Sequence, residues 1–341
     1  MNIVFRVDSS KNIGSGHLIR CITLANELCK KKHSVTFICR ALPGNLINLA
    51  EQKHLVRILP LIKTLQFDDF YLDWLGSTQD QDAKQTIENM PNNVDLLVVD
   101  SYALSEFWHK KLRKYTRKIM VIDDLSDRNF DCDILLNQNL GANKGDYQGK
   151  VLNNCTLLLG CEYALLRPEF AQMRSTALEK RKNTKNIKNI LISMGGSDNQ
   201  NLTYNVLQNI SNIFNIVVVL GQNSPHNEMI KTYSQDKNVE VIIGASNMAE
   251  LMLNADLAIG AGGSTSWERC CLGLPTLLYI LAENQKEIAN SLEQLGAVTI
   301  VQDLKNNLQT VIDDFTLWQD MSAKSKIVCD GLGVKRVAQA I

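Results

Sequence analysis

The chain of 341 residues has no excess of charge of either sign, because 36 lysines and arginines balance 36 aspartates and glutamates. This balance argues against nucleic acid or an anionic membrane surface as the main partner. No apolar run approaches the roughly 20 residues that a bilayer-spanning helix needs. The first residues lead directly into an apolar strand and do not resemble a signal peptide. We therefore expect a cytoplasmic protein that does not bind a membrane, with any anion site confined to a local patch.

Motifs that would indicate a metal centre or a P-loop are also missing. The nine cysteines form no CxxC pair, the five histidines form neither HxxH nor HExxH, and no GKS or GKT sequence occurs. An odd number of scattered cysteines, several of them within apolar runs, is typical of reduced thiols in the cytosol. We expect no metal and no other cofactor. Nothing in the sequence requires an oligomer, so we expect a monomer.

Alternating strand-like and helix-like runs fill the chain in two series. The first series of apolar runs extends from Ile3–Val7 to Ile134–Leu136, and the second extends from residues 189–194 to Val298–Val301. Such alternation predicts parallel strands joined by right-handed crossovers. We therefore predict an α/β protein of two Rossmann-like domains, whose parallel sheets face a cleft.

The polar stretch at residues 179–188 separates the two series and indicates a domain boundary. We predict an N-terminal domain at 1–160, a linker at 161–187 and a C-terminal domain at 188–341. The tail from Phe315 has a helical pattern. Its last helix is free to pack back on the N-terminal domain.

The loop after the first strand brings two glycines next to a histidine. Gly14 and Gly16 precede His17, which falls in the first turn of a helix with a 3.6-residue apolar period. The positive end of the helix dipole disfavours a protonated imidazole, and a neutral imidazole at a cleft can act as a general base. The loop is not a dinucleotide fingerprint, because Ile19 occupies the position of the third glycine. A tight turn with a capping or core histidine is the alternative interpretation.

Charged and polar residues accompany His17. Arg6 and Asp8 end the preceding strand. Asp8 could orient the imidazole, contact a sugar hydroxyl, or simply begin the loop as an Asx turn. Two later strands end in Asp100-Ser101-Tyr102 and Asp123-Asp124, which could hold a sugar or form ordinary strand-end turns.

The second half of the chain carries loops that suit a nucleotide. Residues 262–265 form a glycine-rich anion cradle without a lysine, and Gly195 and Gly196 lie in a similar loop. Glu268 falls one turn into the next helix, where a carboxylate can accept two hydrogen bonds from a ribose diol. Helix capping, dipole compensation or a solvated helix face are the alternatives for these polar residues. The loop residues expected to contact the substrate are Gly195, Gly196, Gly262, Gly263, Ser264, Thr265, Asn284 and Gln285.

Seven motifs, in order and over nearly the whole chain, give the sequence a family resemblance. It resembles the UDP-sugar hydrolases of pseudaminic acid biosynthesis, and these are related to the peptidoglycan N-acetylglucosaminyltransferase. The motifs are R-x-D-S-S-x-x-I-G-x-G-H-x-x-R-C (6–21), V-V-D-S-Y (98–102), I-D-D-L-S-D-R (122–128), C-D-I-L-L-N-Q-N (132–139), L-L-G-C-E-Y-A-L-L-R-P-E-F (158–170), I-S-M-G-G-S-D (192–198) and G-G-S-T-S-W-E (262–268).

The resemblance implies a GT-B fold and the hydrolysis of UDP-2,4-diacetamido-2,4,6-trideoxy-β-L-altropyranose to UDP and the free hexose. The hexose would enter a nine-carbon acid that decorates flagellin or a surface polysaccharide. His17 matches the catalytic histidine of the family motif, and Glu268 matches the residue that holds the ribose hydroxyls. The N-terminal domain would then bind the sugar and the C-terminal domain would bind UDP. Arg6, Asp8, Gly14, Gly16 and Tyr102 are the expected sugar-side residues.

Two other functions fit the same residues. A glycosyltransferase of the same fold would use the same UDP site and pass the sugar to an acceptor. A sugar-nucleotide-binding protein without catalysis would have affinity for UDP and no turnover, although a histidine in a glycine loop argues against it.

Overall fold

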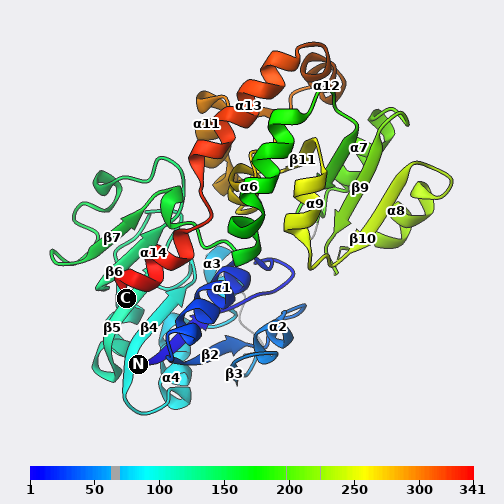
Figure 1. The fold of residues 1–341 in the computed structure, drawn as a ribbon. Coiled ribbons are helices and arrows are strands. Elements are labelled where there is room, and N and C mark those ends of the chain that lie inside the picture. The colour runs from blue at the N-terminus through cyan, green and yellow to red at the C-terminus, as the bar shows by residue number, and fades with distance from the viewer. Residues whose placement is uncertain (63–69, 197, 223) are drawn as a thin grey trace. The chain divides into compact units, whose positions relative to one another are not determined.

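The computed structural model describes residues 1–62, 70–196, 198–222 and 224–341. The chain divides into two compact units (Figure 1). Unit 1 contains residues 1–165 and 333–341, and unit 2 contains residues 166–332. The segment 161–187, expected as a linker, is largely helix α6 (Pro168–Asn183), which is part of unit 2.

Unit 1 is built on a seven-stranded sheet in the order β3-β2-β1-β4-β5-β6-β7, with every neighbouring pair parallel. Its strands are β1 (Asn2–Val7), β2 (Ser34–Arg40), β3 (Leu55–Leu59), β4 (Val94–Asp100), β5 (Thr116–Ile122), β6 (Ile134–Asn137) and β7 (Thr156–Leu159). Its helices are α1 (Gly16–Lys30), α2 (Ile47–Glu51), α3 (Phe70–Leu75), α4 (Gln79–Asn89), α5 (Glu106–Leu112) and α14 (Gly333–Ala340), with short 3₁₀ turns η1 (Arg113–Tyr115), η2 (Lys144–Tyr147) and η3 (Cys161–Tyr163).

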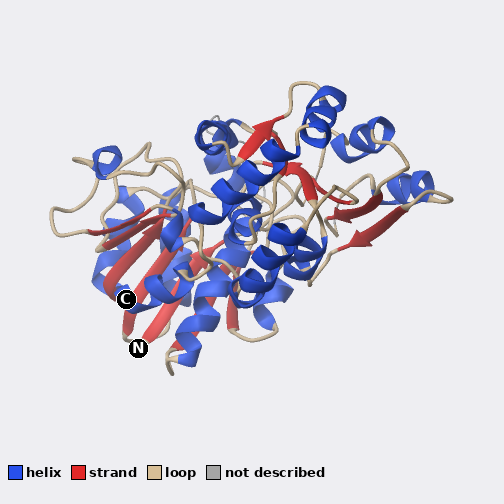
Figure 2. Ribbon diagram, turned by 45° about the horizontal axis from the view of Figure 1, so that its top comes forward, coloured by secondary structure: helices blue, strands red, loops and turns tan. Residues whose placement is uncertain are grey.

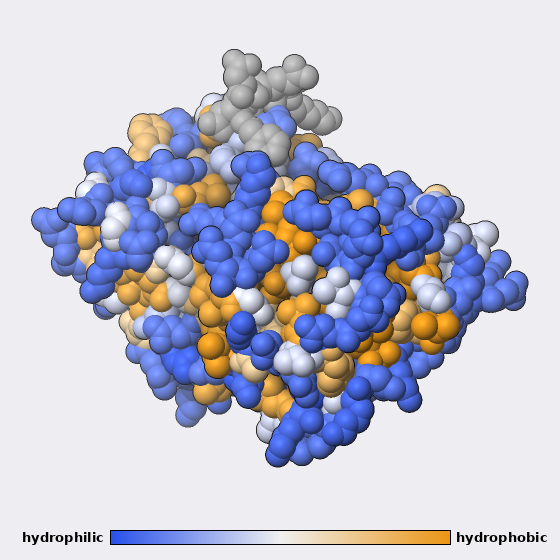
Figure 3. All heavy atoms as spheres, turned by 90° about the horizontal axis from the view of Figure 1, so that it is seen from above, coloured by the Kyte–Doolittle hydropathy of each residue, from blue (hydrophilic) through white to orange (hydrophobic). Residues whose placement is uncertain are grey.

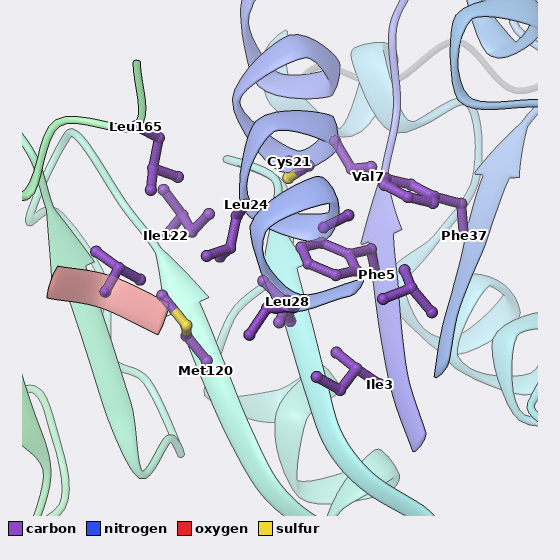
Figure 4. Packing of buried hydrophobic residues seen from close by; sticks show 14 of the residues in the cluster. Ile3, Phe5, Val7, Cys21, Leu24, Leu28, Phe37, Met120, Ile122 and Leu165 are labelled. Carbon is purple, nitrogen blue, oxygen red and sulfur yellow. The ribbon is translucent and has the colours of Figure 1, made fainter. Parts of the chain in front are cut away.

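Both faces of this sheet are buried. Successive residues of a strand point to opposite faces, so Phe5 packs with α1 and α14, and Val4 packs with α3, α4 and α5. In Figure 4, Leu24 and Leu28 of α1 point toward the strands that carry Phe5 and Ile122. Burial of both faces explains why the strands read as continuous apolar runs, as parallel sheets require.

Helix α14 completes unit 1 although it comes last in the chain. The Arg336 guanidinium donates to the carbonyl of Glu162 at 2.8 Å, and Lys31 donates to the carbonyl of Ala338. Gly333 allows the close approach, because a Cβ there would lie 2.4 Å from the carbonyl oxygen of Ala164. The C-terminal helix therefore returns to the first sheet.

Unit 2 is built on a six-stranded sheet in the order β10-β9-β8-β11-β12-β13, and all of its pairs are parallel. Its strands are β8 (Asn189–Ser193), β9 (Asn215–Leu220), β10 (Val239–Ile243), β11 (Leu257–Ala261), β12 (Thr276–Tyr279) and β13 (Val298–Ile300). Besides α6, its helices are α7 (Leu202–Asn209), α8 (Asn227–Ser234), α9 (Met248–Asn254), α10 (Thr265–Cys271), η4 (Glu283–Gln285), α11 (Lys286–Leu295), α12 (Leu304–Asp313) and α13 (Phe315–Val328). The predicted α/β fold with two parallel sheets is confirmed (Figure 2).

Each sheet reverses its strand order once, and this reversal positions the candidate site residues. The reversal lies between β1 and β4 in unit 1 and between β8 and β11 in unit 2. The loops that leave two such strands diverge to opposite sides, which opens a crevice at their carboxyl ends. The loop with His17 follows β1, and residues 262–265 follow β11. The loops identified from the sequence motifs therefore lie at the carboxyl ends of the strands, where the strand order opens a crevice in each unit.

On the face shown in Figure 3, hydrophilic residues predominate along the outline and hydrophobic residues are visible between them.

Among the residues that the structure describes, we find no helix with the length and apolar character needed to cross a bilayer.

Candidate functional site

The loop after β1 is a tight turn that starts α1. The backbone N–H of Gly14 donates to the carbonyl of Ser10 at 2.9 Å, and Gly14 has a φ of +78°, a conformation that favours glycine. The hydroxyl of Ser10 accepts from the backbone of Ile13 at 3.0 Å. Helix α1 begins at Gly16, so His17 lies in its first turn as predicted.

His17 pairs with Asp100, the last residue of β4. Its Nδ1 lies 2.6 Å from Oδ1 of Asp100, which is buried. Arg20 holds the same carboxylate with two hydrogen bonds, from Nε at 2.6 Å and from Nη2 at 2.7 Å. Burial acts to raise the pKa of Asp100, but Arg20 and His17 outweigh it and hold that pKa well below its usual range. An ionised Asp100 accepts the Nδ1 proton, which leaves Nε2 of His17 as the basic nitrogen.

Tyr102 and Asp124 extend this network. Oδ2 of Asp124 accepts hydrogen bonds from the Tyr102 hydroxyl at 2.8 Å and from Arg20 at 2.7 Å. Burial, followed by the charge of Asp124, raises the pKa of Tyr102, so the phenol keeps its proton. The Tyr102 ring meets the His17 ring edge-on, with centroids 4.7 Å apart. The imidazole is therefore held on one side by a carboxylate and on another by an aromatic ring.

A small hollow that opens to solvent adjoins His17. One wall is aromatic, because Tyr71 contacts both Trp74 and Tyr102, with ring centroids 5.5 and 5.4 Å apart. The hollow therefore combines a basic nitrogen, two carboxylates and an apolar wall. It is lined by Asp8, Ile13, His17, Tyr71, Trp74, Leu75, Asp100, Ser101, Tyr102 and Ala103.

The structure does not fit two roles expected near His17. Arg6, expected to bind substrate, is fully buried, and it pairs with Asp8 at 2.7 Å and with Asp82 at 2.5 Å. Asp8, one candidate to orient the imidazole, instead accepts from Arg6 and from the backbone of Arg40 at 2.6 Å. It still lines the hollow, where a sugar hydroxyl could meet it. The carboxylate that contacts the imidazole is that of Asp100, whose position depends on β4 lying beside β1.

In unit 2, the loop after β11 presents free backbone donors. The N–H of Gly262 is committed to the carbonyl of Tyr279 at 3.0 Å, which corrects its expected place in the anion cradle. For the N–H groups of Gly263, Ser264 and Thr265, the described part of the chain supplies no acceptor. The turn is closed by the N–H of Ser266, which donates to the carbonyl of Gly263 at 2.9 Å. Three adjacent amides are therefore open to an anion.

Glu268 lies in α10 with only 14% of its side chain exposed. Burial raises the pKa of Glu268 to about 7, although Arg167 and Arg269 act against this shift. The Arg167 guanidinium lies 3.8 Å from the Glu268 carboxylate and also donates to the carbonyl of Ser246 at 3.2 Å. Arg167 was not singled out as a site residue from the sequence, although it lies within one of the family motifs.

The loop after β8 carries two further residues that we expected to contact the substrate. Gly195 and Gly196 are exposed after β8, and Ser197 lies outside the described residues. Asp198 caps α7, since its carboxylate accepts from Leu202 at 2.9 Å and from Thr203 at 3.0 Å.

Two expected residues lie near the loop after β12. The side-chain oxygen of Gln285 accepts from the backbone of Leu281 at 2.9 Å, and its amide nitrogen is 4.0 Å from the position of a Cβ on Gly263. Asn284 lies in η4, but its side chain is outside the described part of the structure. Among the described residues, no group of three or more His, Cys, Asp or Glu side chains is arranged to hold a metal ion.

Residues 176–327 match the glycosyltransferase family 28 C-terminal domain. An uncharacterized protein of Methanocaldococcus jannaschii is 30% identical over 297 residues, which are 84% of this chain and 57% of that protein. The UDP-2,4-diacetamido-2,4,6-trideoxy-β-L-altropyranose hydrolase of Campylobacter jejuni is 27% identical over 305 residues, which are 87% of this chain and 97% of that enzyme. The resemblance predicted from the motifs is thereby confirmed.

The fold comparison agrees with the sequence matches. The crystal structure of MurG from Acinetobacter baumannii superposes with a TM-score of 0.66 at 14% identity, over 100% of this chain and 99% of that one. At this identity the likeness shows the fold, which is the expected GT-B type. The chain spans a little over half the length of the archaeal relative and nearly the whole length of the Campylobacter enzyme.

Proposed function

We propose that this protein hydrolyses UDP-2,4-diacetamido-2,4,6-trideoxy-β-L-altropyranose to UDP and 2,4-diacetamido-2,4,6-trideoxy-L-altrose, in pseudaminic acid biosynthesis. The observation that carries the proposal is the His17–Asp100 pair at the edge of a partly apolar hollow. The hydrolase relative and the full set of motifs support the choice of substrate.

In this mechanism, His17 is the general base. Nε2 takes a proton from water while the water oxygen attacks the anomeric carbon and the bond from that carbon to the UDP oxygen breaks. The attack is opposite the leaving group, so the sugar configuration inverts. Asp100 holds the tautomer that leaves Nε2 unprotonated, and it stabilises the imidazolium that forms. The bond electrons leave with UDP, and the proton on His17 returns to solvent.

The sugar part of the substrate is assigned to unit 1. The aromatic wall of Tyr71, Trp74 and Tyr102 suits a sugar that carries a C-methyl group and two acetamido methyl groups, because these groups gain free energy by leaving water. Asp8 and Ser101 supply polar contacts for hydroxyl or amide groups. A fully hydroxylated hexose would bury polar groups against this wall at a cost.

The UDP part is assigned to unit 2. The open N–H groups of Gly263, Ser264 and Thr265 suit the diphosphate, and Glu268 suits the two ribose hydroxyls. Gly195 and Gly196 remain candidates for a second phosphate contact. Donors aimed at the leaving diphosphate stabilise the charge that develops on it.

The test is release of UDP from the purified sugar nucleotide in the absence of any acceptor. Hydrolysis predicts stoichiometric UDP and free sugar at a rate proportional to enzyme. A matched reaction with UDP-N-acetylglucosamine should release far less UDP, because that sugar has a 6-hydroxyl and lacks the second acetamido group. Affinity for UDP without any turnover would leave a binding protein as the better account.

A glycosyltransferase is the alternative, and the match to the family 28 C-terminal domain favours it. It would use the same UDP contacts and the same base, with an acceptor hydroxyl in place of water. UDP release that begins only when an acceptor is added would support the transferase and contradict the hydrolase.

A further inference from the structure

A buried arginine that the mechanism above does not use lies under the glycine loop of unit 2. Arg269 is 3% exposed and lies in α10, five residues after the loop residue Ser264. Long side chains of a helix point back toward its N-terminus. The guanidinium of Arg269 therefore reaches back to the segment 262–265.

The guanidinium joins the two ends of that segment. Its Nη2 donates to the carbonyl of Ala261 at 2.7 Å and to the hydroxyl of Ser266 at 3.0 Å. These residues immediately precede and follow the loop. Gly260 makes room for the group, because a Cβ at this position would lie 2.8 Å from Nη1 of Arg269. The cation is therefore fixed at the base of the loop that presents the open amides.

This charge forms no ion pair with a described residue, and the Glu268 carboxylate acts on it only from a longer distance. Among the described residues, no carboxylate lies within 4.0 Å of the guanidinium, and its hydrogen-bond partners, the Ala261 carbonyl and the Ser266 hydroxyl, are neutral oxygens. Nε is buried without a hydrogen-bond partner. Burial lowers the pKa of Arg269 to about 10, so the group keeps its charge at neutral pH. An unpaired buried charge costs free energy, and a nearby anion would offset that cost.

We propose that Arg269 is a positioning residue that also supplies a counter-charge for the diphosphate. It fixes the loop 262–265, and it attracts the phosphates through space without a direct contact. The inference rests on the proposed UDP site. A charge held in a low-dielectric setting acts over a longer range than one in water. Arg269 should therefore select for phosphorylated ligands and contribute little to binding of the nucleoside.

The test compares the binding of UDP and uridine by calorimetry to the wild-type protein, Arg269→Met and Arg269→Lys. We expect Arg269→Met to weaken UDP binding about tenfold and uridine binding less than about twofold, while Arg269→Lys keeps the wild-type preference within about threefold. As salt rises, the ratio of UDP affinity to uridine affinity should fall in the wild type, and it should fall less in Arg269→Met.

Arg181 provides a matched control. It is also buried, its pKa is also lowered to about 10 by burial, and it donates to backbone carbonyls of Met252 and Ala255. These carbonyls precede β11, at the opposite edge of the sheet from the loop. Arg181→Met should leave the ratio of the UDP and uridine affinities unchanged, whatever it does to thermal stability.

Three results would overturn the inference. UDP and uridine affinities that fall in parallel in Arg269→Met would mean a structural role only, and an unchanged UDP affinity would mean no role. If Arg269→Met does not fold, the wild-type protein decides: a ratio of UDP to uridine affinity that does not change as salt rises would contradict attraction of the phosphates by a charge. A wild-type protein that binds no UDP would contradict the proposed function itself, and these results are distinguishable from that one.

Discussion

Nδ1 of His17 lies 2.6 Å from a carboxylate oxygen of Asp100, a residue 83 positions away in the chain. The contact exists because β1 and β4 are neighbours at the point where the strand order reverses. The same reversal in unit 2 brings the end of β11 beside β8. The proposed base and the proposed diphosphate loop each lie where the strand order of their own sheet reverses.

Replacing the base should abolish turnover and spare nucleotide binding. For His17→Ala we expect kcat to fall by about 10² to 10⁴, because that is the usual contribution of a positioned base. The affinity for UDP should stay within about twofold of the wild type, since its proposed contacts are in unit 2. Steady-state kinetics and calorimetry measure the two effects. A near-normal kcat would contradict the assignment of His17.

Asp100→Asn tests the orienting role of the carboxylate. The amide cannot stabilise the imidazolium, and Arg20 loses a charged partner that it binds at 2.6 Å. We expect kcat to fall by about 10² or more with a smaller change in KM. Asp95→Asn, on the same strand, is the control and should leave kcat unchanged. Equal effects of the two substitutions would exclude a specific role for Asp100.

Trp74→Ala should weaken recognition of the sugar. Trp74 forms part of the aromatic wall, 5.5 Å from the Tyr71 ring. Loss of a large aromatic contact predicts an increase in KM of about tenfold or more for the diacetamido sugar nucleotide. UDP alone should bind as before. The exposed Tyr115, truncated to alanine, serves as the control for loss of an aromatic residue in unit 1.

Glu268 should make UDP binding depend on pH. Because burial raises the pKa of Glu268 to about 7, the carboxylate that accepts from ribose is depleted below that pH. Affinity for UDP should therefore decrease as pH falls from 8 to 6, and Glu268→Gln should bind more weakly with a flatter profile. A variant that keeps the wild-type pH dependence would show that another group is responsible.

The same shift has the opposite consequence for stability. The pKa of Glu268 in the folded protein is above its ordinary value of 4.5, so this group favours folding at low pH and loses that contribution as pH rises through about 7. Without ligand, Glu268→Gln should therefore gain stability relative to the wild type at pH 8 and not at pH 5. Urea unfolding at the two pH values provides the measurement.

His109 should make unit 1 sensitive to acid. Both of its ring nitrogens are buried without hydrogen-bond partners, and burial, with Arg128 and Arg113 nearby, lowers the pKa of His109 to about 3. The unfolded chain binds a proton below about 6.5 while the folded protein does not, so stability falls as pH decreases from 6.5 to 3. Over this pH range, His109→Phe should reduce the loss in the free energy of unfolding by up to about 1.4 kcal/mol per pH unit. An unchanged pH dependence would contradict the assignment.

The sequence predicted the strands because their central residues are buried and mostly apolar, as in β1, β4, β8 and β11. It predicted the glycine loops because their residue types suit a turn near a ligand. The range 161–187 was expected to be a linker because it ends in a charged stretch. Helix α6 occupies most of this range, and Lys180 and Arg181 near its end donate to carbonyls of α9.

The side-chain partners were harder to predict, since they depend on strand order. Arg6, Asp8 and His17 are close in sequence, which suggested a common role. Arg6 in fact belongs to a buried ion cluster with Asp82, which comes from α4. The commitment of the Gly262 amide to Tyr279 depends on the pairing of β11 with β12. No local pattern in the sequence specifies either contact.

The most direct test of the central claim is turnover of the altrose-configured UDP-sugar in ¹⁸O-labelled water without an acceptor, followed by mass spectrometry of both products. Attack at the anomeric carbon predicts the label in the free sugar and none in UDP, and this reaction should be lost in His17→Ala. Label in UDP would mean attack at phosphorus and would contradict the assigned mechanism. Absence of any UDP would contradict the hydrolase itself.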